Sequence, residues 1–179
     1  MNIILLKHGN KYSADDVNRQ AEKLMHYADY PIFCFTEDQK DVIIDCIEIP
    51  KKPKLAKWWN KLHVYRYDFA LDGRCVMFDL DIDITDNPFP YIESIDWRYP
   101  TFIEDGHKSE LYYEKHAYET MLNSSIMAWT SYRNTEYWDI FSRNIDYYTR
   151  KYKGIDRYVW DKKLQYRKFN DGIRSTVIL

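Results

Sequence analysis

A short apolar segment that leads directly into alternating aspartates constrains the fold more than any other feature of the sequence. Residues 75–78 (Cys-Val-Met-Phe) are typical of a buried strand, and Asp79, Asp81 and Asp83 follow at every second position. Charged carboxylates cannot stay buried without partners, so they must emerge where the strand ends. Alternate side chains of a strand face the same way, so we expect the three aspartates to project together.

Clustered carboxylates at this place indicate a cation site. Like charges that lie close together repel unless a cation lies between them, and hard divalent ions prefer carboxylate oxygen. Open α/β sheets bind ligands outside the carboxyl ends of their strands, which is where these aspartates would lie. The alternative is a solvated loop, because single aspartates are common turn residues. The alternation favours a metal site that includes Asp79 and Asp81.

The composition is that of one soluble globular domain. The chain has 179 residues, of which 45% are hydrophobic and 30% charged, a balance that argues against disorder. No apolar stretch approaches the ~20 residues that span a bilayer, so we expect no membrane span. Cys34, Cys46 and Cys75 are isolated within apolar runs, which predicts reduced core thiols and a cytoplasmic location.

Hydrophobic patterning predicts alternating strands and helices. The expected strands lie at residues 2–6, 31–35, 42–49, 75–78, 101–103 and 125–129. Their order with the intervening helices, β-α-β-β-α-β at the beginning, predicts a three-layer α/β domain with a mixed central sheet.

Three helices are expected from caps and periodicity. Ser13 with Asp16 resembles an N-terminal cap, and the face that this first helix buries should carry Val17, Ala21, Leu24 and Met25. The second helix should bury Trp58, Leu62, Tyr65 and Phe69. A third, of about three turns, should bury Trp138, Phe141, Ile145 and Tyr148.

The charge is unevenly distributed along the chain. Between Arg143 and Arg174 there are ten Lys or Arg residues and four Asp, although the whole chain carries a net charge of −2. Tyrosines and a tryptophan are interleaved with these cations. A nucleic-acid partner is one interpretation of such a mixture. We favour aromatics that pack inward and cations that face a cleft, because the acidic remainder of the chain repels a polyanion.

Six short motifs occur in the order found in small bacterial or phage glycosyltransferases of the GT-A fold, among the relatives of family-eight sugar transferases. They are Lys11-Tyr12, Cys34-Phe35-Thr36-Glu37-Asp38, Trp59-Asn60-Lys61-Leu62, Asp79-Leu80-Asp81, Asn123-Ser124-Ser125 and Gly154-Ile155-Asp156-Arg157. The chain therefore resembles this family from its first strand to about Trp160. The resemblance implies a single domain, with a nucleotide-binding half at 1–85 and a sugar and acceptor half at 86–179.

The resemblance also implies a role for each motif. Asp79 and Asp81 would hold Mn²⁺ or Mg²⁺ against the diphosphate of a nucleotide sugar, with a UDP-sugar as the expected donor. Lys61 would reach the donor phosphate or sugar, and with Asp156 it is a candidate catalytic residue. The other implied contacts are to the base and ribose by Tyr12, Thr36 and Asp38, and on the sugar and acceptor side by Asn123, Ser124 and Asp156. The acceptor itself, whether glycan, protein, small molecule or nucleic acid, is left open.

Two departures from the family pattern concern how the sugar and the metal are held. Arg157 stands where relatives usually carry Gln, and no His-Gly-Lys-Pro-like segment supplies a further metal ligand. Another group or water would then complete the coordination, or this form of the site would be metal-poor. Plain structural roles are the alternative for Tyr12, Lys61 and the Asn123-Ser124 pair, as core aromatic, solvated lysine and turn residues.

Two other functions compete with sugar transfer. Asp81-Ile82-Asp83-Ile84-Thr85 resembles the first motif of haloacid-dehalogenase-like phosphatases, in which Asp81 would be the nucleophile and Asp83 the acid/base. That family places its motif on the first core strand, whereas about eighty residues precede it here. A catalytically silent nucleotide-sugar-binding module is the third possibility.

Overall fold

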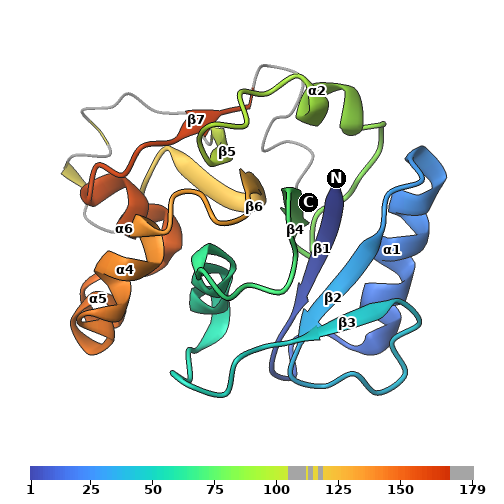
Figure 1. Cartoon of the computed structure of the whole chain (residues 1–179), viewed down its shortest axis with the longest axis horizontal. Helices are drawn as coiled ribbons and strands as arrows, with labels where there is room; N and C mark the ends of the chain where they lie inside the picture. The colour runs from blue at the N-terminus through green and yellow to red at the C-terminus, as the bar shows by residue number, and fades with distance from the viewer. Residues whose placement is uncertain (105–111, 113–114, 117–118, 170–179) are drawn as a thin grey trace.

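A seven-stranded mixed sheet forms the centre of the molecule (Figure 1). The computed structural model describes residues 1–104, 112, 115–116 and 119–169. The strands are β1 (Asn2–Lys7), β2 (Ile32–Thr36), β3 (Asp45–Glu48), β4 (Arg74–Phe78), β5 (Thr101–Glu104), β6 (Leu122–Thr130) and β7 (Arg167–Lys168). Their order is β3-β2-β1-β4-β6-β5-β7. The first four are parallel neighbours, whereas β6 pairs antiparallel with both β4 and β5, so the predicted mixed sheet is confirmed.

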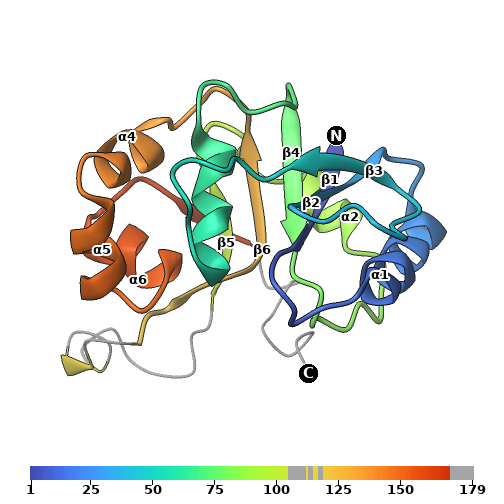
Figure 2. The ribbon, with the colours of Figure 1, turned by 90° about the horizontal axis from the view of Figure 1, so that it is seen from below.

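Helices cover both faces of the sheet and complete three layers (Figure 2). One face packs on α1 (Ala14–Tyr27) and α2 (Phe89–Glu93), and the other on η1 (Lys57–Tyr65), α4 (Glu136–Ser142) and α6 (Ile155–Asp161), with α5 (Ile145–Lys151) beyond. Strand β1 shows why both faces need cover. Ile3 and Leu5 belong to the core under α1, whereas Ile4 and Leu6 belong to the core under η1, as a period of two requires.

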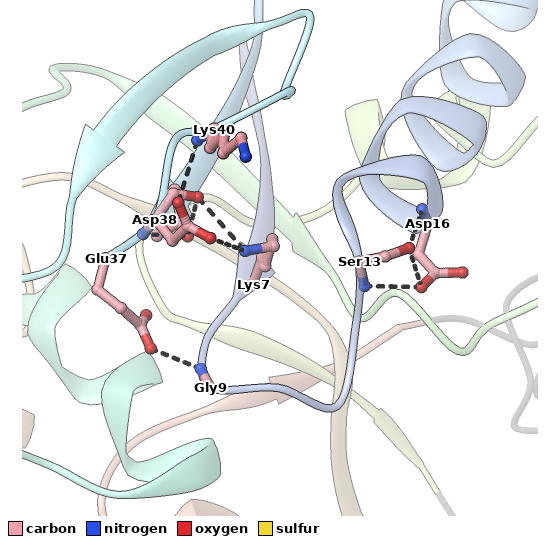
Figure 3. Close-up of polar contacts among 8 residues, drawn as sticks. Lys7, Gly9, Ser13, Asp16, Glu37, Asp38 and Lys40 are labelled. Atoms are coloured by element: carbon pink, nitrogen blue, oxygen red, sulfur yellow. Dashed lines mark hydrogen bonds and ion pairs between the residues drawn. The ribbon is translucent and has the colours of Figure 1, made fainter.

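Helix α1 begins at the predicted cap. The Ser13 hydroxyl accepts a hydrogen bond from the Asp16 backbone N–H, and the Asp16 carboxylate accepts one from the Ser13 N–H (Figure 3). The expectation that Met25 is buried was wrong, since 51% of it is exposed. Gln20 lies inside instead, and its side-chain amide donates to the Ile82 carbonyl oxygen at 3.2 Å, which ties the loop after β4 to α1.

The second predicted helix is a 3₁₀ helix, and this changes which face is buried. Three residues per turn place Trp59, Leu62 and Tyr65 on one line, and all three are buried. Trp58, which the α-helical period assigned to the core, is 39% exposed. The error therefore came from the assumed period.

The third predicted helix is two helices. α4 ends at Ser142 and α5 begins at Ile145, because Asn144 caps α5 by accepting a hydrogen bond from the Tyr147 N–H at 3.2 Å. The aromatics of the basic stretch mostly pack inward as predicted, Tyr152 and Tyr158 being buried, although Tyr147 is 48% exposed. The last ten residues of the chain, which include Asp171 and Arg174, lie outside the described residues.

Two further expectations concern membranes and thiols. Among the described residues, no helix has the length and apolar character required to cross a bilayer. The three cysteines are free thiols, with Cys34 and Cys75 buried and Cys46 half-buried.

Candidate active site

A cavity of about 470 Å³ opens at the carboxyl ends of β1 and β4. The chain winds from β1 to β2 and β3 in one direction, whereas β4 lies on the other side of β1. Such a reversal of strand order leaves a crevice between the two strands, which is where open α/β sheets bind ligands. Three segments line the cavity: residues 8–12 after β1, Lys57, Trp58 and Lys61 of η1, and residues 79–81 after β4.

The loop after β1 is shaped by a tight turn at Gly9. Its φ of +61° lies in the left-handed region that favours glycine, and its N–H donates to a Glu37 carboxylate oxygen at 2.5 Å (Figure 3). This turn presents His8, Lys11 and Tyr12 to the cavity. Burial lowers the pKa of His8, so its ring is neutral at neutral pH.

The three alternating aspartates separate after β4. The strand ends at Phe78 and the chain turns at Leu80-Asp81, so Asp79 and Asp81 face the cavity. Asp83 instead forms an ion pair of 2.8 Å with Lys23 of α1. The expectation that all three project together was therefore wrong for Asp83, because the turn directs it toward the helix on the opposite face.

Asp79 belongs to a cluster that we define as Lys61, Asp79, Ser124 and Asp156 and call the buried ion cluster, because Lys61 and Ser124 are buried; the two aspartates are half-buried. The Lys61 ammonium lies 2.7 Å and 2.8 Å from the two carboxylate oxygens of Asp79, and it donates to the Ser124 carbonyl oxygen at 2.8 Å. The Lys61 side chain is 4% exposed. Lys61 thus has the acceptors that a buried ammonium requires, and its contact with both oxygens fixes the orientation of the Asp79 carboxylate.

Asp156 completes the buried ion cluster from α6. Burial raises the pKa of Asp156 to about 6, against the opposing charge of Lys61 and a hydrogen bond from Ser124, and the charge of Asp79 adds to the increase. One of its carboxylate oxygens is buried and has no hydrogen-bond partner among the described residues. Burial likewise raises the pKa of Asp79, and Lys61 opposes the shift. The cluster holds two carboxylates and one ammonium, so its protonation depends on pH near neutrality.

Asp81 also lines the cavity, but its side chain is more exposed than that of Asp79. One of its oxygens accepts hydrogen bonds from the Tyr12 hydroxyl at 2.7 Å and from the Lys11 ammonium at 3.0 Å. Burial alone would raise the pKa of Asp81, but these hydrogen bonds hold it below its usual value. Hydrogen bonding to Tyr12 and Asp81 raises the pKa of Lys11 in turn. At neutral pH Asp81 is therefore an ionised carboxylate that is half-exposed to the cavity.

Other predicted site residues lie near this cavity but do not line it. Thr36 and Asp38 follow β2, beside the end of β1, where the Asp38 N–H donates to the Thr36 hydroxyl and the Asp38 carboxylate accepts from Lys7 at 3.4 Å (Figure 3). Asn123 accepts a hydrogen bond from the Ser125 N–H at 2.7 Å. The structure thus brings Tyr12, Lys61, Asp79 and Asp81 to one cavity. Ser124 and Asp156 lie behind them in the buried ion cluster.

The donor set of the cavity fits a divalent cation. Asp79, directly after β4, and Asp81, in the turn that follows, provide hard carboxylate oxygens to the same cavity, and Asp81 keeps its charge at neutral pH. Within the described part of the chain, no three His, Cys, Asp or Glu side chains are grouped as metal ligands. Two protein carboxylates, with ligand oxygens and water, are the coordination that these residues support.

Five polar or aromatic residues that line the cavity were given no site role by sequence reasoning: His8, Asn10, Lys11, Lys57 and Trp58. His8 and Asn10 follow β1 directly, so the rule that ligands bind at strand ends was sufficient to find them. Lys57 and Trp58 carried no such signal, because their exposure depends on the 3₁₀ geometry of η1.

The fold is that of GT-A glycosyltransferases. The galactosyltransferase LgtC, solved with donor and acceptor sugar analogues, superimposes with a TM-score of 0.65 and 12% identity, over 95% of this chain and 73% of that one. The glycosyltransferase GlyE of Streptococcus pneumoniae TIGR4 superimposes with a TM-score of 0.60 and 12% identity, over 95% of this chain and 45% of its own length. A glycosyltransferase involved in glycosylation of the major capsid of PBCV-1 superimposes with a TM-score of 0.56 and 9% identity, over 95% of this chain and 82% of that one.

Sequence comparison adds no relative to these structural ones. No protein-family model matches the chain, and no curated protein sequence matches it. The phosphatase alternative loses its structural support, because its motif belongs on the first core strand and here it follows the fourth strand of a GT-A fold.

Proposed function

We propose that this protein is a metal-dependent glycosyltransferase that moves a sugar from a nucleoside-diphosphate donor, preferentially a UDP-sugar, to an acceptor. The observation that carries the proposal is the cavity at the β1/β4 crevice, which combines Asp79, Asp81 and a lysine-rich wall. The GT-A fold supports it independently.

In the proposed reaction an acceptor hydroxyl oxygen bonds to the anomeric carbon of the donor sugar. The bond from that carbon to the diphosphate oxygen breaks, the diphosphate keeps the electron pair, and the hydroxyl proton passes to the diphosphate or to solvent. The transition state resembles an oxocarbenium ion while negative charge grows on the diphosphate. The site must therefore stabilise that negative charge.

Several residues of the chain would contribute to stabilising the charge on the diphosphate. Asp79 and Asp81 would hold Mn²⁺ or Mg²⁺, which supplies Lewis-acid neutralisation of the diphosphate. Lys61 fixes the orientation of Asp79 through the contacts of 2.7 Å and 2.8 Å. Lys11 and Lys57 line the same cavity and add positive charge near the diphosphate. The remaining assigned contacts, of Tyr12, Thr36 and Asp38 to the nucleoside and of Asn123, Ser124 and Asp156 to the sugar side, belong to this proposal.

A thermal-shift titration with nucleoside diphosphates tests the proposal. UDP with Mn²⁺ is expected to stabilise the wild-type protein, by about 2.7 kcal/mol at ~100 times the dissociation constant, and chelation of the metal should abolish the effect. Asp81→Asn should lose this stabilisation. Asp83→Asn is the matched control, because it removes an equal charge two residues away while Asp83 faces Lys23 rather than the cavity.

The outcomes separate the three candidate functions. Equal responses of Asp81→Asn and Asp83→Asn would contradict the metal assignment. Stabilisation by UDP without hydrolysis or transfer of UDP-sugars would indicate the silent binding module. Covalent aspartyl phosphate at Asp81 and a severe loss of phosphatase activity in Asp83→Asn would indicate the phosphatase.

A further inference from the structure

A second cavity, of about 650 Å³, lies beside the candidate active site, and we call it the basic groove. One wall is residues 54–59, which lead into η1, and the other is residues 145–153, which form α5 and the turn after it. Lys57 and Trp58 line both the basic groove and the cavity at β1 and β4. A molecule in the basic groove would therefore lie next to a donor bound at Asp79 and Asp81.

The basic groove is strongly cationic although the whole chain is slightly acidic. Its lining carries four cations and a single carboxylate, Asp146. The cations, all exposed, are Lys54, Lys57, Arg150 and Lys153. None of the four forms an ion pair with another residue of the described chain, in contrast to Lys61, Lys11 and Lys23. The Lys57 ammonium lies over the Trp58 ring, 5.2 Å from its centroid. Ammonium and guanidinium groups without a carboxylate partner are available to bind carboxylate or phosphate.

An exposed indole, that of Trp58, lines both the basic groove and the cavity at β1 and β4. Trp58 is 39% exposed, whereas Trp59 beside it is 5% exposed and stacks on Phe141. The Trp58 indole lies so close to Gly154 that a Cβ at that position would be 3.2 Å from the indole nitrogen. Glycine at 154 thus leaves the space that the indole occupies. An exposed aromatic ring with a polar edge is a surface on which the apolar face of a sugar ring stacks.

We propose that the basic groove is the acceptor site and that the acceptor is an acidic saccharide, carrying carboxylate or phosphate groups. This inference rests on the proposed sugar transfer, because it places the second substrate of that reaction. Trp58 would hold the sugar ring next to the donor, and Arg150 and Lys153 would bind its acidic groups. A nucleic acid fits less well, since stacking of successive bases requires several exposed rings and the lining offers Trp58 alone as an exposed aromatic.

Calorimetric titration with matched sugars tests the proposal. The probes are methyl glucuronide and glucose 6-phosphate as the two acidic forms, and methyl glucoside as the neutral one, each in the presence of UDP and Mn²⁺. We expect at least one acidic probe to bind about tenfold more tightly than methyl glucoside, and the comparison of the two identifies carboxylate or phosphate as the acidic group. The double variant Arg150→Glu/Lys153→Glu should abolish this preference. Arg143→Glu, at an exposed arginine outside the lining of the groove, should preserve it.

The design separates failure of this inference from failure of the proposed function. UDP stabilisation is measured in parallel, and both variants should retain it, because Arg150 and Lys153 do not line the cavity at β1 and β4. Equal affinity for acidic and neutral sugars, or equal effects of the two variants, would overturn the acceptor assignment while UDP binding stands. Tighter binding of a single-stranded DNA oligonucleotide than of either acidic sugar would also overturn it. If the wild-type protein does not bind UDP, the donor site itself is contradicted.

Discussion

Lys61 and Lys57 lie four positions apart on η1, but they belong to two regions in which charged side chains have different roles. Lys61 is buried in the ion cluster, where the Asp79 carboxylate and the Ser124 carbonyl oxygen hold its ammonium. Lys57 lies in the basic groove, where the cations have no ion-pair partner among the described residues and face solvent. Buried charges must be satisfied internally or they destabilise the fold, whereas exposed ones cost little and remain free for ligands. The first region therefore governs stability and the second recognition.

Removing the buried lysine is expected to have the largest effect. Lys61→Met leaves the half-buried Asp79 and Asp156 without their cation, which should cost up to about 3–5 kcal/mol of unfolding free energy in a urea titration. Lys57→Met is the control on the same helix and should stay within ~0.5 kcal/mol. The double variant Lys61→Met/Asp79→Asn should recover part of the loss. Equal stabilities for Lys61→Met and Lys57→Met would remove the distinction between the two regions.

Asp156→Asn should stabilise the protein at neutral pH but not at acidic pH. The raised pKa, about 6, means that the folded state holds the proton more tightly than the unfolded state, so stability falls as pH rises from about 4 to about 6. Asparagine removes this penalty, which corresponds to about 1–3 kcal/mol near pH 7. Chemical denaturation at pH 4 and pH 7.5 measures the difference. A variant that is less stable than wild type at pH 7.5 would show that ionised Asp156 is stabilising.

Tyr12→Phe should have a smaller effect on stability and a clear effect on the pKa of Asp81. Loss of the 2.7 Å hydrogen bond frees one lone pair of Asp81 and should cost about 0.5–1.5 kcal/mol. The pKa of Asp81 should rise toward its usual value, because that hydrogen bond helps to hold it low. Carboxyl NMR titration of wild type and variant is the measurement. An unchanged pKa would indicate that Lys11 alone sets the charge of Asp81.

The smallest effect is expected for the ion pair between Lys23 and Asp83. Both side chains are nearly half-exposed, 41% and 48%, and such pairs contribute about 0.2–1 kcal/mol. A double-mutant cycle with Lys23→Met and Asp83→Asn gives the coupling energy directly. A coupling as large as that of Lys61 with Asp79 would mean that exposure does not distinguish the buried and exposed pairs of this protein.

Local patterns were sufficient for much of the fold and for part of the site. The apolar residues 75–78 followed by aspartates predicted a buried central strand with acids at its end, and the Ser13/Asp16 pair predicted the start of α1. Both depend on neighbours a few residues away, so the chain alone specifies them. The order of strands and helices likewise led to the three-layer mixed sheet. The roles assigned by resemblance to the site residues stay predictions; these residues are Tyr12, Thr36, Asp38, Lys61, Asp79, Asp81, Asn123, Ser124 and Asp156.

Long-range packing was required for the rest, because it joins residues that are far apart in the chain. Lys61 is buried only because Asp79 and Ser124, 18 and 63 positions away, provide its acceptors. Asp83 turned away because Lys23 of α1 lies across the loop, 60 positions distant. The basic groove exists because residues 54–59 pack beside residues 145–153. Sequence period describes one element at a time, whereas each of these environments depends on contacts between elements.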